Sequence, residues 1–265
     1  QESTQRMEVP GQTPRDVPSR SKSVMDMEIL ESNADGSARV KGTYQSVDID
    51  YGAGPMADML KRMSSSGAGL GAALAGKSFT FKLSPAGEVS EIEGLAELQT
   101  AALQSLQVPE EGRKIILQMI NEICSPENLK AMASGMFLYL PGKPVRIGES
   151  WSKQSGADFG VALSMENTWT LKEVRSDAIV LDRAMKITPG KSTGDSPFPG
   201  KMDISGTGTG VVEIDPATGW IRRSQTAIDT AGTMTIPAAQ TSKGENRTVK
   251  MTSTGTNSTL VTRKK

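Results

Sequence analysis

The chain of 265 residues contains no histidine. Without an imidazole it can form neither a Ser-His-Asp or Cys-His catalytic centre nor a His-ligated zinc or haem site. Its single cysteine, Cys124, excludes an internal disulfide and a thiolate metal cluster. These absences remove the commonest catalytic constellations, so the sequence predicts a protein that is not an enzyme and that carries no metal or cofactor.

Neither sign of charge is in excess, because 30 Lys and Arg residues balance 30 Asp and Glu residues. This balance argues against binding of nucleic acid or of an anionic membrane through bulk charge. No stretch approaches the ~18 apolar residues of a membrane span, so we expect no transmembrane segment. Aromatic residues make up only 4% of the chain, which predicts a core built mainly from Leu, Ile, Val, Met and Ala.

Residues 1–20 are polar, contain three prolines, and show neither an initiator Met nor a leader peptide. This start is typical of a mature or trimmed product from which a leader has been removed, and it predicts a polar N-terminal segment. Residues 21–265 are expected to form a single β-rich domain with a helical insertion at about residues 94–134.

Alternation of polar and apolar residues dominates the domain and indicates strands separated by turns. A first hairpin is expected around Asp35-Gly36 and a second around Pro85-Ala86-Gly87. The strand signal resumes after residue 137. The expected strands of the two hairpins and the last three strands of the chain cover residues 21–31, 38–50, 77–83, 88–92, 202–214, 220–235 and 247–262.

Within the insertion the apolar period changes from two to about 3.6, which predicts three helices. The first carries Leu95, Leu98, Ala102 and Leu106 on one face. The other two follow between residues 109 and 135. Helices in one block with strands on both sides predict an α+β fold: a large antiparallel sheet, strongly curved or closed as far as a half-barrel, with the helices packed on one face.

Residues 71–78 match the phosphate-binding pattern G-x-x-x-x-G-K-[ST]. A P-loop needs a strand that delivers its glycines and a helix that begins at Lys-[ST]. Residues 56–63 before the match have helical spacing, and residues 77–83 after it alternate like a strand. We therefore interpret the match as the end of a flexible loop, residues 64–76, that leads into the first strand of the second hairpin, and keep nucleotide binding as the least favoured alternative.

Two further patterns invite a catalytic interpretation. Glu91 and Glu93 project from one face of an expected strand, as an acid/base couple would, although solvated strand faces also carry such pairs. Ser150 and Lys153 match the S-x-x-K of penicillin-recognising enzymes, but in a strand-like segment where a helix is required. Between them Trp151 is expected to be a core anchor, with ligand stacking as the alternative.

The run from Pro141 to Trp151, PGKPVRIGESW, resembles a motif of an uncharacterised family of bacterial envelope proteins. The second hairpin and the turn at residues 215–220 strengthen the resemblance, which extends from about Val24 over most of the chain. Members of that family are typically exported, many as lipoproteins, and have a β-rich domain of unknown function. The resemblance implies an exported protein that is periplasmic or associated with the cell envelope, and it supplies no catalytic residues.

One set of residues suggests a ligand. Met56, Met59, Leu60 and Met63 share one face of a short helix beside a Gly-rich tract, and Met adapts to irregular apolar shapes. This predicts a non-enzymatic envelope protein that binds a hydrophobic or amphiphilic small molecule between sheet and helices. The alternatives are that these residues are core contacts, and that the protein is a structural or protein-interaction module whose partner is another envelope protein.

Overall fold

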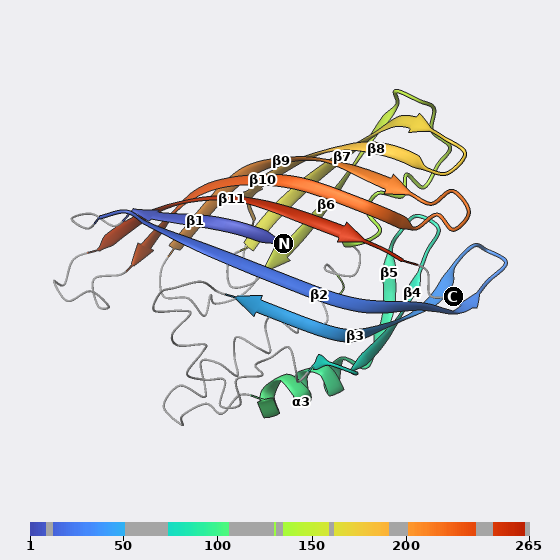
Figure 1. Cartoon of the computed structure of the whole chain (residues 1–265), viewed down its shortest axis with the longest axis horizontal. Coiled ribbons are helices and arrows are strands. Elements are labelled where there is room, and N and C mark those ends of the chain that lie inside the picture. Colours follow the sequence, from blue (N-terminus) through green and yellow to red (C-terminus); the bar gives the residue numbers. More distant parts are fainter. Residues whose placement is uncertain are drawn as a thin grey trace.

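The computed structural model describes residues 1–8, 13–50, 74–105, 130, 135–158, 162–190, 201–236 and 246–262. In these residues it contains one helix and one antiparallel sheet of eleven strands (Figure 1). The elements are β1 (Glu2–Glu8), β2 (Arg15–Ser32), β3 (Ala38–Asp50), β4 (Ser78–Leu83), β5 (Val89–Glu93), α3 (Leu95–Ser105), β6 (Ser150–Asp158), β7 (Ala162–Val174), β8 (Ile179–Pro189), β9 (Lys201–Ile214), β10 (Ile221–Ile236) and β11 (Arg247–Leu260).

The sheet consists of two meanders that meet at the N-terminal strand. The strand order is β5-β4-β3-β2-β1-β11-β10-β9-β8-β7-β6, and the pairing of β1 with β11 joins the two halves. Residues 1–20, expected as a polar segment, thus supply β1 and the start of β2. The two edge strands, β5 and β6, follow each other in the chain, and the connection between them carries α3.

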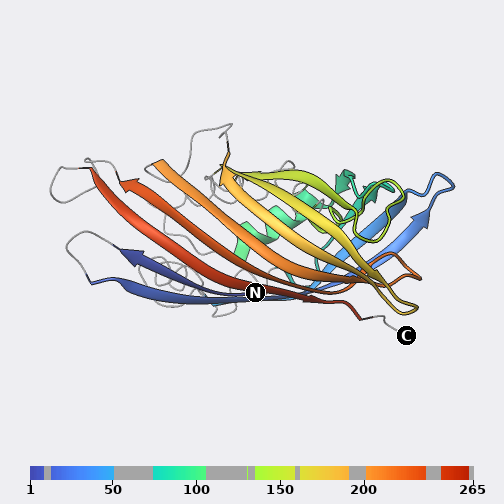
Figure 2. The same cartoon turned by 90° about the horizontal axis from the view of Figure 1, so that it is seen from above.

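The predicted α+β fold is wrong, because the described part of the chain is nearly all sheet. The first expected helix is present as α3, which buries Leu98 beside β4. Residues 106–129 and 131–134, where most of the other two helices were expected, lie outside the described residues. A 3.6-residue period identifies a helix but does not show that helices form a layer over a sheet. The sheet is strongly curved (Figure 2), and α3 lies beside its β4–β5 edge (Figure 1).

The two predicted hairpins are confirmed. β2 pairs with β3 across a turn in which Gly36 has φ 80°, and β4 pairs with β5 across a turn in which Gly87 has φ 81°. Both glycines adopt the left-handed conformation that their turns require. The strand signal after residue 137 was placed too early, because residues 136–139 form turns and β6 begins at Ser150.

The core is mainly aliphatic, as the composition predicted, because only six of the 20 buried apolar residues of the described part are aromatic. The aromatic residues are nevertheless gathered in one place. Every aromatic residue of the described part belongs to one core cluster. The Phe137 ring lies 5.9 Å from that of Phe81 on β4 and 5.6 Å from that of Trp220 beside β10. It therefore connects the two halves of the sheet. The cluster's aromatic members are Tyr44, Phe79, Phe81, Phe137, Tyr139, Trp151, Trp169 and Trp220.

Polar contacts bring the two edges of the sheet together at the same end. Lys153 Nζ on β6 donates to the carbonyl oxygen of Ala86, in the turn between β4 and β5, at 2.5 Å. The Tyr139 hydroxyl donates to the carbonyl oxygen of Gly219 at 2.8 Å. The sheet is thus drawn around its aromatic core, with an inner face that carries the core and an outer face toward solvent.

Candidate functional site

The inner face of the sheet carries a row of five residues at equivalent positions on neighbouring strands. Pairing places Trp151 beside Trp169, Trp169 beside Arg183, Arg183 beside Gly210 and Gly210 beside Thr226. The row crosses β6 to β10. Its central member is a cation between apolar neighbours, since Leu181 and Met185, two residues away on the same face of β8, are both buried.

Three neutral acceptors hold the Arg183 guanidinium. Its Nη2 and Nε donate to Oδ1 of Asn167 at 2.6 and 3.1 Å, and its Nη1 donates to the Thr226 hydroxyl at 3.4 Å. The sulfur of Met185 lies 3.6 Å from Nη2. Asn167 and Thr226 are each only 1% exposed. The guanidinium is therefore fixed from both sides by buried side chains.

Gly210 explains how Arg183 reaches Thr226. Adjacent strands lie ~4.8 Å apart, so the backbones of β8 and β10 are separated by about 10 Å with β9 between them. The Arg183 side chain must cross β9 at its neighbour Gly210. A Cβ atom there would lie 2.8 Å from the Thr226 hydroxyl and would overlap the carbonyl oxygen of Gln225. Glycine thus keeps the path of the guanidinium open.

Burial affects the charge of this group. Desolvation lowers the pKa of the Arg183 guanidinium from its usual value. Arginine nevertheless stays protonated in proteins, so a positive charge lies on the inner face. Among the described residues, no carboxylate forms an ion pair with it.

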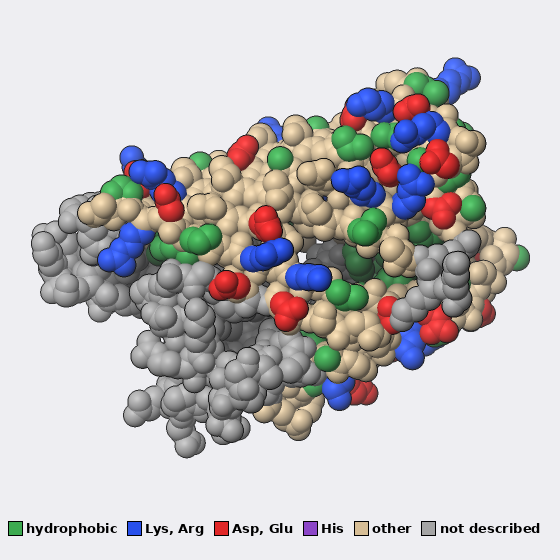
Figure 3. Space-filling model, viewed as in Figure 1, with side chains coloured by type: hydrophobic (Ala, Val, Ile, Leu, Met, Phe, Trp, Pro, Cys, Tyr) green, Lys and Arg blue, Asp and Glu red, His purple; other side chains and the backbone are tan. Residues whose placement is uncertain are grey.

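Beyond the aromatic cluster the inner face of β7 to β10 is mostly apolar and only partly covered, whereas on β1 it carries Ser3 and Gln5. Met185 and Ile187 continue the inner row of β8 and are buried, whereas Met165, Ile204 and Ile228 on the neighbouring strands are partly exposed. Five methionines face inward along this surface: Met7, Met165, Met185, Met234 and Met251. In Figure 3 the molecule is hollowed near its centre, and hydrophobic side chains are visible inside the hollow.

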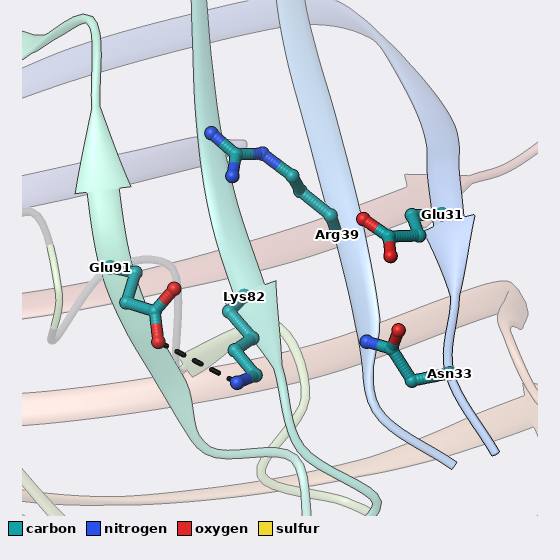
Figure 4. A pocket seen from close by; sticks show the side chains of 5 residues that line it. All are labelled: Glu31, Asn33, Arg39, Lys82 and Glu91. Carbon is teal, nitrogen blue, oxygen red and sulfur yellow. Dashed lines mark ion pairs between the residues drawn. The ribbon is translucent and has the colours of Figure 1, made fainter. Parts of the chain in front are cut away.

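A second candidate site lies on the outer face. A pocket of about 210 Å³ is lined by Glu31, Asn33, Arg39, Lys82 and Glu91 (Figure 4). Lys82 Nζ lies 3.6 Å from a carboxylate oxygen of Glu91, and Arg39 Nη2 lies 2.5 Å from one of Glu93. These side chains are largely exposed, and two carboxylates and two cations line the pocket. Exposed ion pairs contribute little to binding or stability, so we favour the inner face.

The carboxylate pair and the S-x-x-K match do not form catalytic sites. Glu91 has φ 51° at a bulge in β5, and Glu91 and Glu93 pair with different cations. Ser150 and Lys153 project from opposite faces of β6, where Ser150 shares a hydrogen bond with Thr170. Trp151 is 9% exposed and stacks on Trp169, as expected of a core anchor.

The phosphate-binding match leads into a strand, as the sequence indicated. Ser78 begins β4, and its hydroxyl shares a hydrogen bond of 2.8 Å with that of Thr43 on β3. The helix that a P-loop needs after Lys77 is therefore replaced by a strand. The proposed ligand-binding residues Met56, Met59, Leu60 and Met63 lie outside the described residues, so their role stays a prediction.

The sequence analysis missed Arg183 and its partners, although the alternation of polar and apolar residues marks Asn167 and Arg183 as polar residues at inward positions. Asn167 shares a face with Leu163, Met165, Trp169 and Leu171, where a polar residue is unexpected. Arg183 is the corresponding exception in the row formed by Leu181, Met185 and Ile187. The register that brings the two exceptions together could not be read from either strand alone.

Searches for other site types give two negative findings within the described ranges. No group of three or more Asp, Glu, Cys or His side chains there is arranged to hold a metal ion. No helix in the same ranges is both long and apolar enough to cross a membrane.

Comparison with protein-family models matches residues 35–221 to a family of unknown function (DUF6263). The chain belongs to this family. The DUF6263 match runs from the turn before β3 to the first residue of β10, so it includes Asn167, Arg183 and Gly210. It confirms the resemblance to an uncharacterised family, whereas the envelope location of the members stays a prediction. Comparison with curated proteins found no match.

Proposed function

We propose that this protein is a non-enzymatic cell-envelope protein that holds a hydrophobic or amphiphilic molecule against the inner face of its sheet. The observation that carries the proposal is the partly exposed apolar surface beyond the aromatic cluster. A packed core buries such side chains fully, whereas Met165, Ile204 and Ile228 keep part of their surface accessible. Apolar surface of this kind, on the concave side of a sheet, suits an apolar ligand.

The composition of the surface supports a ligand of variable shape. Methionine is unbranched and flexible, so a methionine-lined wall adapts to different apolar chains. The glycines at positions 206, 208 and 210 on β9 all face inward. They let side chains of the neighbouring strands pack across β9, since a Cβ atom at Gly208 would lie 2.9 Å from the Met185 side chain. The envelope location is supported by the resemblance described for residues 141–151.

The alternative is a structural or protein-interaction module, and the aromatic end of the molecule favours it. There Phe81, Phe137 and Trp220 fill the space between the two halves of the sheet. If the inner face is filled in the same way along its whole length, no small molecule can enter. Binding measurements separate the two functions.

The test is a titration of the full chain with saturated fatty acids of increasing length. Each buried CH₂ contributes ~0.8 kcal/mol, so affinity should increase steadily with chain length. Ile228→Asp places a charge on the inner face and should weaken binding strongly. Ala227→Asp is the matched control, because the neighbouring side chain on the same strand is exposed on the outer face.

Two results would contradict the proposal. One is the absence of saturable binding by the wild-type chain at every length. The other is equal loss of affinity in the two variants while circular dichroism shows both to be folded. Either result would leave the structural module as the better account.

A further inference from the structure

Arg183 is set apart from other arginines of the described chain by what surrounds it. Arg6, Arg20, Arg39, Arg175 and Arg222 each lie within 4.0 Å of a carboxylate, in solvent-exposed pairs. Arg183 instead lies on the inner face, held by Asn167 and Thr226, with no ion pair among the described residues. Its surroundings orient the charge without neutralising it.

A desolvated charge is unfavourable unless an opposite charge or several hydrogen bonds compensate it. The amide oxygen, hydroxyl and thioether around Arg183 are neutral, and they engage four of the five N–H groups of the guanidinium, which leaves one N–H of Nη1 for a further acceptor. An anion is the natural further partner, because a charge-assisted hydrogen bond to a carboxylate or phosphate would compensate the buried charge.

A buried donor without a partner among the described residues lies on the same row of the sheet. The indole Nε1 of Trp151 is buried and has no hydrogen-bond partner in the described part of the chain. Trp151 and Arg183 flank Trp169 at equivalent positions on three neighbouring strands. Trp169 is only 3% exposed and separates the two, so the indole N–H belongs to the closed aromatic cluster, and Arg183 is the donor of this row that lies beside the partly exposed surface.

We propose that Arg183 binds the anionic head group, a carboxylate or a phosphate monoester, of an amphiphile whose apolar chain lies along the inner face. This inference rests on the proposed function. The position of Arg183 also gives the direction of the chain. On one side of it Leu181 belongs to the closed core cluster, whereas Met185 and Ile187 on the other side lead to the partly exposed Met165 and Ile204.

The experiment compares three ligands of one chain length: dodecanoate, dodecyl phosphate and 1-dodecanol. Each displaces an apolar fluorophore from the full chain. Wild type should bind at least one of the two anions about 10-fold or more tightly than the alcohol, as expected for a charge-assisted hydrogen bond. Arg183→Met should remove this preference and keep the affinity for the alcohol. Arg183→Lys should keep part of the preference, and the exposed, outward Lys186→Met should keep all of it.

The outcomes separate the inference from the proposed function. If all three ligands bind wild type equally, or if the preference survives in Arg183→Met, the head-group site is wrong while the apolar site stands. If none of the three binds, the proposed function fails and the inference fails with it. If Arg183→Met does not fold, two measurements test the head-group site instead: wild type must prefer an anion over the alcohol, and Arg183→Lys must keep part of that preference. The ratio of the two anion affinities identifies the preferred head group.

Discussion

Lys153 and Ala86 join the two edges of the sheet, since Lys153 Nζ on β6 donates a 2.5 Å hydrogen bond to the Ala86 carbonyl oxygen beyond β4. The residues are 67 positions apart in sequence and belong to opposite ends of the strand order. The contact explains why the sheet curves around the aromatic core: an inward lysine on one edge strand binds the turn that precedes the other.

This contact predicts a pH dependence. Desolvation lowers the pKa of Lys153 below its ordinary value of 10.5, an effect that the nearby Glu88 carboxylate opposes. Between the lowered pKa of Lys153 in the folded chain and its ordinary pKa in the unfolded chain, the unfolded chain binds more protons than the folded one. The free energy of unfolding should therefore rise with pH up to about 10.5. Urea denaturation from pH 8 to 10.5 should show this rise in wild type and in the control Lys186→Met, but not in Lys153→Met. An equal slope in all three proteins would refute it.

Tyr139 should make the free energy of unfolding fall, rather than rise, as pH increases above 10. Burial raises the pKa of its hydroxyl well above the usual 10.0. Above pH 10 the tyrosine therefore ionises in the unfolded chain but not in the folded one, so stability should fall as pH increases. Tyr139→Phe should remove this contribution. It should also lower stability at neutral pH by about 1 kcal/mol, because the hydrogen bond to Gly219 is lost. A steeper alkaline loss in the variant than in wild type would contradict the assignment.

Gly87 is expected to be intolerant of any side chain. It has φ 81°, and a Cβ atom would overlap the carbonyl oxygen of Phe137 in the core. Gly76 is the matched control, with φ 76° and no atom within 4 Å of the added Cβ. Both alanine variants incur the left-handed penalty of ~1–2 kcal/mol. Thermal denaturation should therefore show a clearly larger loss for Gly87→Ala, and equal losses would show that Phe137 can move away at little cost.

The fold was partly predictable because the alternation of polar and apolar residues that marks a strand can be seen in a short stretch of sequence. The strands β3 and β4 and the turn at Gly87 follow directly from residues that are adjacent in the chain. The pairing of β1 with β11 does not, since it joins residues about 250 positions apart and β1 is nearly all polar. Its inner residues Ser3, Gln5 and Met7 are only partly buried, so selection for apolar side chains is weak there.

The candidate site was less predictable than the fold. Arg183, Asn167 and Thr226 come from three strands, and only their register places them together. The mainly aliphatic core was predicted from the composition, but the aromatic cluster within it was not: composition counts aromatic residues and does not show that those of the described chain gather in one place.

The phosphate-binding match should be inert. Lys77 precedes β4 and is exposed, so Lys77→Ala should leave thermal stability nearly unchanged with or without Mg-ATP. A ligand present at 100 times its Kd stabilises the native state by ~2.7 kcal/mol, and we expect no such gain in wild type. A rise in Tm with Mg-ATP that disappears in Lys77→Ala would restore the nucleotide hypothesis.

The most direct test of the ligand-binding account is native mass spectrometry of the full chain purified from its own host. We expect the wild-type protein to carry an added mass that dissociates on collisional activation and fragments as an amphiphile. The adduct should persist in Ala227→Asp and be lost from folded Ile228→Asp, because only the latter side chain faces the inner surface. Bare protein in all three preparations, or an adduct of equal abundance in both variants, would contradict the account.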